Sequence, residues 1–180
     1  FLGHIVSSDG ISTDPSKTKA IQEWPQPKDV PEVRSFVGTC SYYRRFINNF
    51  AEIAKPLNNL MTKSKSFIWT EECSVAFERL KQAITSAPVL SYPCDNCRYV
   101  LVTDSSHHSV DAVLSQIQSG EEKVIAYYSK AISKEERNYC VTRKELLAIV
   151  LSVKQFHHYL YGQHFTVRTD HGSLTWLLNF

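Results

Sequence analysis

Three acidic residues in the second half of this 180-residue chain have the type and position expected of metal ligands. Asp104 follows an apolar run, Asp170 ends a later strand-like segment, and Glu145 lies near the start of a long helical segment. Carboxylates at the ends of buried elements are costly to desolvate, and carboxylates that converge raise one another's pKa. A divalent cation relieves both problems, and oxygen-only ligands favour Mg²⁺ or Mn²⁺ over zinc. The acids therefore suggest hydrolysis of a phosphodiester assisted by two ions.

Each acid also has a purely structural explanation. Asp104 can cap the turn that follows its strand. Thr142 and Glu145 have the spacing of a capping box, in which the glutamate bonds the amide at the helix start, and spacing alone favours that explanation. Asp170 can open a loop or cap the next helix. Composition and periodicity do not choose between these explanations and metal binding.

The first half of the chain has the apolar periodicity of helices. Residues 1–12 are expected to form a strand and turn. Helices are expected over residues 14–24, 29–47, 50–61 and 70–87, with an interruption near Pro56. In the last helix the stripe expected to be buried comprises Val75, Phe77, Leu80 and Ile84.

The pattern changes after Pro88. Strands are expected over residues 99–103, 112–117, 123–132 and 164–170, and helices over residues 142–160 and 173–178. The second half therefore has the order β-β-β-α-β-α. The fold class predicted for the whole chain is α+β / α/β, with a helical segment at residues 1–90, a linker at 91–98 and a mixed domain at 99–180.

Charge and composition limit the function classes only weakly. The formal net charge is +2, from 20 basic and 18 acidic residues, and this balance neither demands nor excludes nucleic acid. No apolar run is long enough to cross a membrane, and no secretory signal is present. Both ends read as the middle of an element, so we expect the chain to be part of a longer protein.

The cysteines indicate a reducing compartment, because their number is odd, at five, and no signal peptide accompanies them. Cys94 and Cys97 have half of a zinc-knuckle spacing, but no second pair of ligands follows at a matching distance. Two cysteines in an exposed linker are the favoured interpretation.

The ordered motifs of the chain resemble the Pol polyprotein of gypsy-type LTR retrotransposons. In the second half the similar segments are residues 102–106, 112–116, 144–150, 156–162, 168–171 and 174–177, which resemble its ribonuclease H domain. In the first half they are residues 1–4, 33–38, 42–47, 51–60, 67–69 and 87–90, which resemble the primer-grip end and thumb of its reverse transcriptase. The resemblance covers essentially the whole chain.

The resemblance implies a role for each candidate residue. Asp104, Glu145 and Asp170 would be three of the four catalytic carboxylates that hold two Mg²⁺ or Mn²⁺ ions. The expected nucleic-acid contacts are Phe1, Leu2, Gly3, Arg44 and Arg45. For the two arginines, a solvated helix face is an equal alternative.

The resemblance also implies substrates and partners. The expected activities are RNA-directed DNA synthesis and hydrolysis of the RNA strand of an RNA–DNA hybrid, and the thumb-like half would hold the primer–template duplex. The expected partners are the upstream polymerase fingers and palm and the downstream integrase segments of the same polyprotein, without a membrane. The expected location is intracellular, in the cytoplasm or nucleus, inside retrotransposon particles.

The chain departs from the family pattern in three places, and two of these departures, the missing fourth carboxylate and Asp111, favour an alternative, a catalytically inert nucleic-acid-binding or scaffold module of the same fold. The fourth carboxylate would lie beyond residue 180, and the polymerase acids would lie before Phe1. Asp111 stands where the family usually has glycine, and we expect it either to disturb the hairpin or to mark a decaying copy, and not to bind metal. A redox or zinc module built on Cys94 and Cys97 is the least favoured interpretation.

Overall fold

The computed structural model describes residues 2–62 and 66–174. Its contacts divide the chain into two compact units, Phe1–Leu90 and Ser91–Phe180. Among the helices of the described residues, none combines the length and the apolar character that a bilayer crossing needs.

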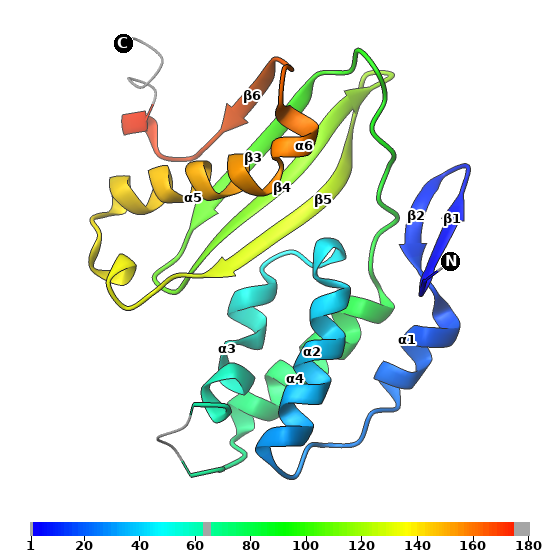
Figure 1. Ribbon diagram of the computed structural model, residues 1–180, viewed down its shortest axis with the longest axis vertical. Coiled ribbons are helices and arrows are strands. Elements are labelled where there is room, and N and C mark those ends of the chain that lie inside the picture. Colours follow the sequence, from blue (N-terminus) through cyan, green and yellow to red (C-terminus); the bar gives the residue numbers. More distant parts are fainter. Residues whose placement is uncertain (1, 63–65, 175–180) are drawn as a thin grey trace. The chain divides into compact units, whose positions relative to one another are not determined.

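The first unit begins with a hairpin of β1 (His4–Ser7) and β2 (Gly10–Thr13), shown in blue in Figure 1. The end of the unit returns to this hairpin, because Ile11 and Leu90 exchange two backbone hydrogen bonds of 2.8 Å. Gly10 permits this approach. It has φ +138°, and a Cβ atom there would lie 2.2 Å from the Leu90 carbonyl oxygen.

Helices form the rest of the first unit: α1 (Pro15–Gln22), α2 (Val30–Tyr42), the short 3-10 helix η1 (Arg44–Phe46), α3 (Phe50–Leu60) and α4 (Glu71–Thr85). Asp14, Asp29 and Thr70 cap α1, α2 and α4 by accepting a hydrogen bond from a backbone amide. The core consists largely of fully buried side chains, among them Phe36, Phe46, Leu57, Leu80 and Ile84.

Three details of the first unit differ from the sequence-based expectation. The helix expected over residues 29–47 ends at Tyr42 and continues only as η1. The interruption expected near Pro56 is absent, since α3 runs through that residue. On α4, Val75 is 48 % exposed, and Cys73 and Ala76 are buried instead. These two residues are one turn before Phe77 and Leu80 and so share their face.

The second unit contains a four-stranded sheet in the order β5-β4-β3-β6. Its strands are β3 (Tyr99–Ser105), β4 (Ser109–Gln118), β5 (Glu121–Ala131) and β6 (Phe165–Arg168). Neighbouring strands are antiparallel except for β3 and β6, which are parallel. A parallel pair needs a long crossover connection. The helices of that crossover, together with β4 and β5, lie between β3 and β6 in the chain.

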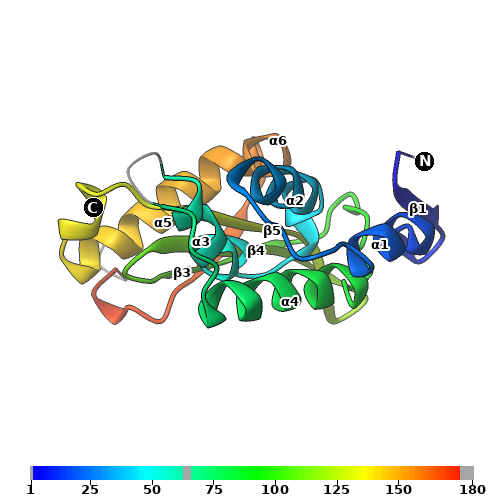
Figure 2. The ribbon, with the colours of Figure 1, turned by 90° about the horizontal axis from the view of Figure 1, so that it is seen from below.

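The crossover includes η2 (Glu136–Asn138), α5 (Val141–Gln155) and α6 (His157–Leu160). Figure 2 shows α5 and α6 on the same side of the strands. Phe156 and Leu160 pack there against Leu101 and Leu114 of the sheet. The predicted order β-β-β-α-β is confirmed, and with it the mixed fold class. The helix expected over residues 173–178 falls mostly on residues 175–180, outside the described residues.

Gln116 organises the segment that leads into the sheet. This side chain is fully buried, and its amide accepts a hydrogen bond from Cys94 N (2.9 Å) and donates to the carbonyl oxygens of Cys94 and Cys97 (3.2 Å each). The two cysteines are half-buried and paired as a disulfide, so they are not the exposed linker cysteines expected from the sequence. The glutamine hydrogen-bonds the backbone of the turn that the disulfide closes.

We therefore predict that Gln116→Leu lowers the free energy of unfolding by about 2–4 kcal/mol, because it removes the hydrogen-bond partner of three part-buried backbone groups, one N–H and two carbonyls. Chemical denaturation of the 180-residue chain, followed by circular dichroism, measures this loss. Gln118→Leu is the matched control. Gln118 is less buried and makes one backbone hydrogen bond, of 2.8 Å to Tyr92 O, so its loss should be smaller. Equal effects of the two variants would contradict the role given to Gln116.

Candidate metal centre

The sheet and α5 bring the three predicted acids together. Asp104 is near the end of β3, Asp170 is two residues beyond the end of β6, and Glu145 is on α5. Because β3 and β6 are parallel neighbours, Asp104 and Asp170 lie together at the carboxyl ends of these strands. One carboxylate oxygen from each acid lies within 4.8 Å of the other two.

Glu145 is the buried member of the group, with 4 % of its surface exposed, whereas Asp104 and Asp170 are exposed. Its Oε1 accepts a hydrogen bond of 2.5 Å from the Ser105 hydroxyl, and its Oε2 is buried without a hydrogen-bond partner. Burial raises the pKa of Glu145. The hydrogen bonds from Ser105 oppose this rise, and the nearby charges of Asp104 and Asp170 add to it.

The capping-box explanation for Glu145 is wrong. The cap position of α5 is Cys140, so Thr142 lies inside the helix, and the Glu145 side chain bonds Ser105 instead of a helix amide. The Thr142 hydroxyl is 2.9 Å from Nε2 of His171. This contact ties the residue after Asp170 to the first turn of α5, one turn before Glu145.

The turn-capping explanation for Asp104 also disagrees with the structure, because β3 continues through Asp104 to Ser105. In the turn that follows β3, the Ser106 hydroxyl accepts hydrogen bonds from the backbone amides of His108 and Ser109. The turn is thus capped by a serine, and the Asp104 carboxylate belongs to the acidic group.

The three acids fit a hard divalent cation such as Mg²⁺. The ligand set is all oxygen, and the buried Oε2 of Glu145 needs a cationic or hydrogen-bonding partner. Two oxygens bound to one Mg²⁺ at about 2.1 Å are at most about 4.2 Å apart. Since the three oxygens lie within 4.8 Å of one another, binding of one ion requires at most a small closing movement of the side chains.

Asp111 does not disturb the hairpin, contrary to the expectation from the sequence. It pairs in register with Asp104 inside β4, and the bulge of that strand lies further on, between Leu114 and Ser115. Asp111 is 6 % exposed, and its Oδ2 accepts a hydrogen bond of 2.7 Å from the Ser109 hydroxyl. Hydrogen bonding allows the strand to hold this carboxylate, which lies outside the group of three acids.

Two of the candidate nucleic-acid residues of the first unit, Leu2 and Gly3, lie beside tyrosines. Phe1 is outside the described residues. Leu2 is exposed, and its carbonyl oxygen accepts a hydrogen bond from the Tyr42 hydroxyl. Gly3 has φ +74°, and a Cβ atom there would be 3.0 Å from the Tyr43 hydroxyl oxygen.

The two arginines lie on η1 rather than on a regular helix face. Arg44 is exposed and sits over the Phe50 ring at 5.7 Å, and Arg45 is half-buried and sits over the Phe46 ring at 6.0 Å. Their role in binding nucleic acid stays a prediction.

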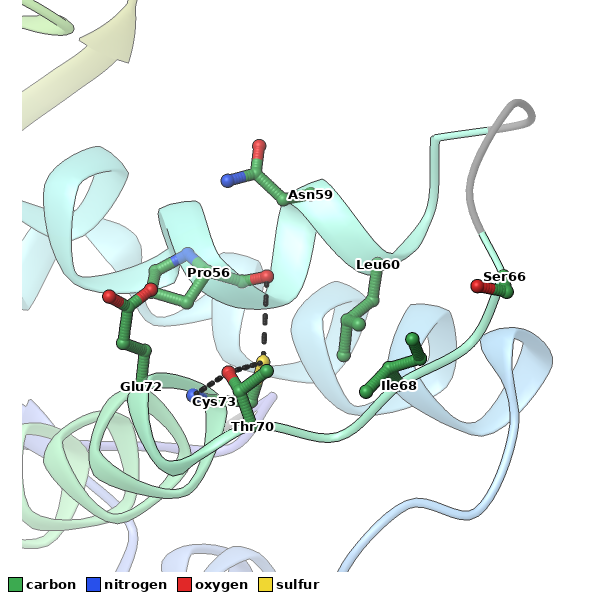
Figure 3. Close-up of a pocket in the computed structure, with 8 residues that line it drawn as sticks. All are labelled: Pro56, Asn59, Leu60, Ser66, Ile68, Thr70, Glu72 and Cys73. Carbon is green, nitrogen blue, oxygen red and sulfur yellow. Dashed lines mark hydrogen bonds between the residues drawn. The ribbon is translucent and has the colours of Figure 1, made fainter.

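A separate pocket of about 490 Å³ lies within the first unit (Figure 3). Its lining residues are Pro56, Asn59, Leu60, Ser66, Ile68, Thr70, Glu72 and Cys73. The Cys73 sulfur accepts a hydrogen bond from the Thr70 hydroxyl (3.3 Å) and lies 3.9 Å from the Pro56 carbonyl oxygen. None of the residues predicted to be functional lines this pocket.

Sequence reasoning missed Ser105, Thr142 and His171 as supports of the acids. Ser105 and Glu145 are 40 residues apart, and Thr142 and His171 are 29 apart. Local spacing carries no signal for such contacts, which exist only once β3, α5 and β6 are assembled.

The raised pKa of Glu145 generates a test of its environment. A carboxyl group whose pKa is raised by folding stabilises the protein below its unfolded-state pKa, near 4.5, and that stabilisation is lost as pH rises through the folded-state pKa. In a metal chelator, Glu145→Gln should therefore raise the melting temperature at pH 7–8 relative to the parent. The difference should vanish toward pH 4.

Glu122→Gln is a control of opposite sign. The pKa of Glu122 is lowered by hydrogen bonds from Ser115 and Arg168, so its ionised form stabilises the fold at neutral pH. Its replacement should lower the melting temperature at pH 7–8. Thermal unfolding between pH 4 and pH 8 measures both variants, and a destabilised Glu145→Gln at pH 8 would contradict the assigned environment.

Comparisons with known proteins point to one family. Residues 69–167 match the family model described as the RNase H-like domain found in reverse transcriptase. The chain is 41 % identical over 179 residues to the retrovirus-related Pol polyprotein from transposon 412 of Drosophila melanogaster, covering 99 % of the chain and 14 % of that protein. It is 40 % identical over 188 residues to the Pol polyprotein from transposon gypsy of the same species, covering 97 % and 18 %.

Solved structures share the fold. The foamy viral protease-reverse transcriptase in complex with double-stranded DNA has a TM-score of 0.84 at 24 % identity, over 100 % of this chain and 38 % of that one. The same protein in complex with an RNA/DNA hybrid has a TM-score of 0.83 at 24 % identity, over 98 % and 24 %. The chain spans less than a fifth of the length of the curated relatives named above. It belongs to the family of RNase H-like domains found in reverse transcriptase, as carried by the Pol polyproteins of gypsy-type LTR retrotransposons.

Proposed function

We propose that the second unit carries most of a metal-dependent ribonuclease H site, which hydrolyses the RNA strand of an RNA–DNA hybrid, and that the first unit holds the primer–template duplex of the reverse transcriptase. The observation that carries the proposal is the convergence of Asp104, Glu145 and Asp170 within 4.8 Å. The nucleic-acid complexes of the foamy viral protein support the choice of substrate by analogy of fold.

In this proposal each acid holds a cation through carboxylate oxygen. Asp104 and Asp170 approach from adjacent strand ends, and Glu145 approaches from α5 with its unpartnered Oε2. Two bound Mg²⁺ or Mn²⁺ ions would supply an activated water and charge stabilisation for the leaving oxygen. The three acids would hold the ions in place. Because Glu145 is buried, water screens its charge less, and its electrostatic attraction for cations is stronger.

Recognition of the hybrid would rest on shape and on the 2′-hydroxyl rather than on base sequence. In the first unit, Arg44 and Arg45 would neutralise backbone phosphates. Leu2 and Gly3, held beside two tyrosines, would contact the primer strand. The further partners we propose are the upstream polymerase and downstream integrase segments of the same polyprotein.

The deciding experiment is cleavage of a hybrid whose RNA strand is labelled, with and without Mg²⁺, by this chain and by a longer Pol segment that continues past residue 180. We expect Mg²⁺-dependent cleavage by the longer segment. If the longer segment is folded and binds hybrid but cleaves nothing, the inert binding module becomes the better explanation. Cleavage that persisted in a chelator would instead contradict the proposed dependence on a metal ion.

Asp104→Asn in the longer segment should lower hybrid cleavage by more than about 100-fold, because even partners outside the ligand shell of a metal typically contribute 10–100-fold. Primed DNA synthesis by a segment that includes the polymerase should stay near the parent level. Single-turnover cleavage and primer extension, run on the same preparation, measure the two activities. Parent-like cleavage by this variant would remove Asp104 from the site.

Arg44→Gln and Arg45→Gln should each weaken binding of a primer–template duplex and lower the slope of log affinity against log salt by about 1, since each would remove one phosphate contact. Fluorescence anisotropy over a salt series measures both quantities. Arg79→Gln is the matched control, an exposed arginine of α4 in the same unit. An equal effect of all three variants would point to general charge attraction rather than to a defined contact.

A further inference from the structure

We infer that Ser105 is a positioning residue of the metal centre, whose hydroxyl fixes the Glu145 carboxylate so that one of its oxygens stays available to the cation; this inference rests on the proposed function. The hydroxyl donates to Oε1 at 2.5 Å, and Oε2 remains buried without a hydrogen-bond partner. Ser105 would touch neither the substrate nor the ion. It acts through Glu145.

The fold directs Ser105 toward α5. Side chains alternate between the two faces of a strand, so Ser105 shares a face of β3 with Thr103 and Leu101. Leu101 packs in the core cluster that includes Phe156, directly after α5. The last residue of β3 therefore presents its hydroxyl to the helix that carries Glu145.

A glutamate needs such a restraint more than an aspartate does, because its longer side chain has more rotatable bonds to fix. In the described part of the chain, no other side chain donates a hydrogen bond to the Glu145 carboxylate. The backbone of Ser105 also hydrogen-bonds this carboxylate, and the Ser105 hydroxyl is the side-chain contact that helps to fix one orientation of Glu145 within the group of acids.

The chemistry of the donor also matters. A lysine or arginine in this place would orient Glu145 but would compete with the metal by neutralising the carboxylate. A hydroxyl donates one hydrogen bond and carries no charge. Ser105 can therefore hold Oε1 while the full negative charge of the three acids remains available to a divalent cation.

The test is Mn²⁺ binding to the 180-residue chain, measured by the decrease of the free-ion signal in electron paramagnetic resonance. Ser105→Ala should weaken Mn²⁺ affinity about tenfold, the lower end of the effect of removing a partner that orients a metal ligand. Ser105→Thr keeps the hydroxyl and suits a strand, so it should restore affinity to within about twofold of the parent.

Ser106→Ala is the matched control. Its hydroxyl bonds the amides of His108 and Ser109 in the turn after β3 and does not contact Glu145. This variant should bind Mn²⁺ like the parent, even if the turn loses stability. An equal loss in Ser106→Ala and Ser105→Ala would overturn the inference, because the effect would then belong to the turn as a whole.

Two further outcomes would also overturn it: parent-like affinity in Ser105→Ala, or no recovery in Ser105→Thr. In both, the parent binds Mn²⁺, so the proposed metal centre survives and only the role of Ser105 fails. Absence of saturable Mn²⁺ binding to the folded parent would instead remove the metal centre and, with it, the inference.

Discussion

The parallel pairing of β3 with β6 is the constraint on which the site depends. It aligns Val102 with Arg168, so the strands run side by side and end at the same edge of the sheet. Asp104 and Asp170 each lie two residues beyond this pair, and they meet only because of it. The pairing in turn requires a crossover, and the crossover helix α5 brings the third carboxylate. One set of backbone hydrogen bonds thus determines the positions of all three acids.

Bringing the three acids together lowers the stability of the folded domain. Burial and two neighbouring carboxylates both disfavour the charged form of Glu145, and the hydroxyl of Ser105 offsets this only in part. Folding energy from the apolar contacts of Leu101, Leu114, Phe156 and Leu160 must hold the group together. Functional sites commonly break the local rules that the rest of a sequence obeys, and the surrounding core compensates.

The predictable part of this fold is the part determined locally. Apolar β-branched runs, turn signals and helical spacing identified the order of elements in the second unit and placed the acids near the ends of β3 and β6 and on α5. Spacing misled at Thr142 and Glu145, because a capping box and an inward-facing carboxylate share one pattern. The helix interruption expected at Pro56 was also wrong. The tertiary packing of α3 outweighs the local preference of proline to break a helix.

Contacts between distant segments lay outside the reach of sequence patterns. Nothing near Ser105 or His171 in the chain indicates its partner on α5. The same holds for Gln116, which local alternation marks only as a strand residue, although it clamps the turn of Cys94 and Cys97. Resemblance to a known family supplied the role of the acids, but it did not supply these supports.

The register of β3 and β6 also has a consequence for how the protein is made. The paired residues Val102 and Arg168 are 66 positions apart (168 − 102), so closing this part of the sheet brings together segments that are synthesised at different times. Hairpins close on a short chain segment, whereas this pair must wait for the whole crossover. During synthesis the β3–β4–β5 meander and α5 can therefore form while the edge of β3 is still open, and Asp170 joins Asp104 and Glu145 only after the whole crossover has been made. Until then β3 presents an unpaired strand edge that can pair with other chains.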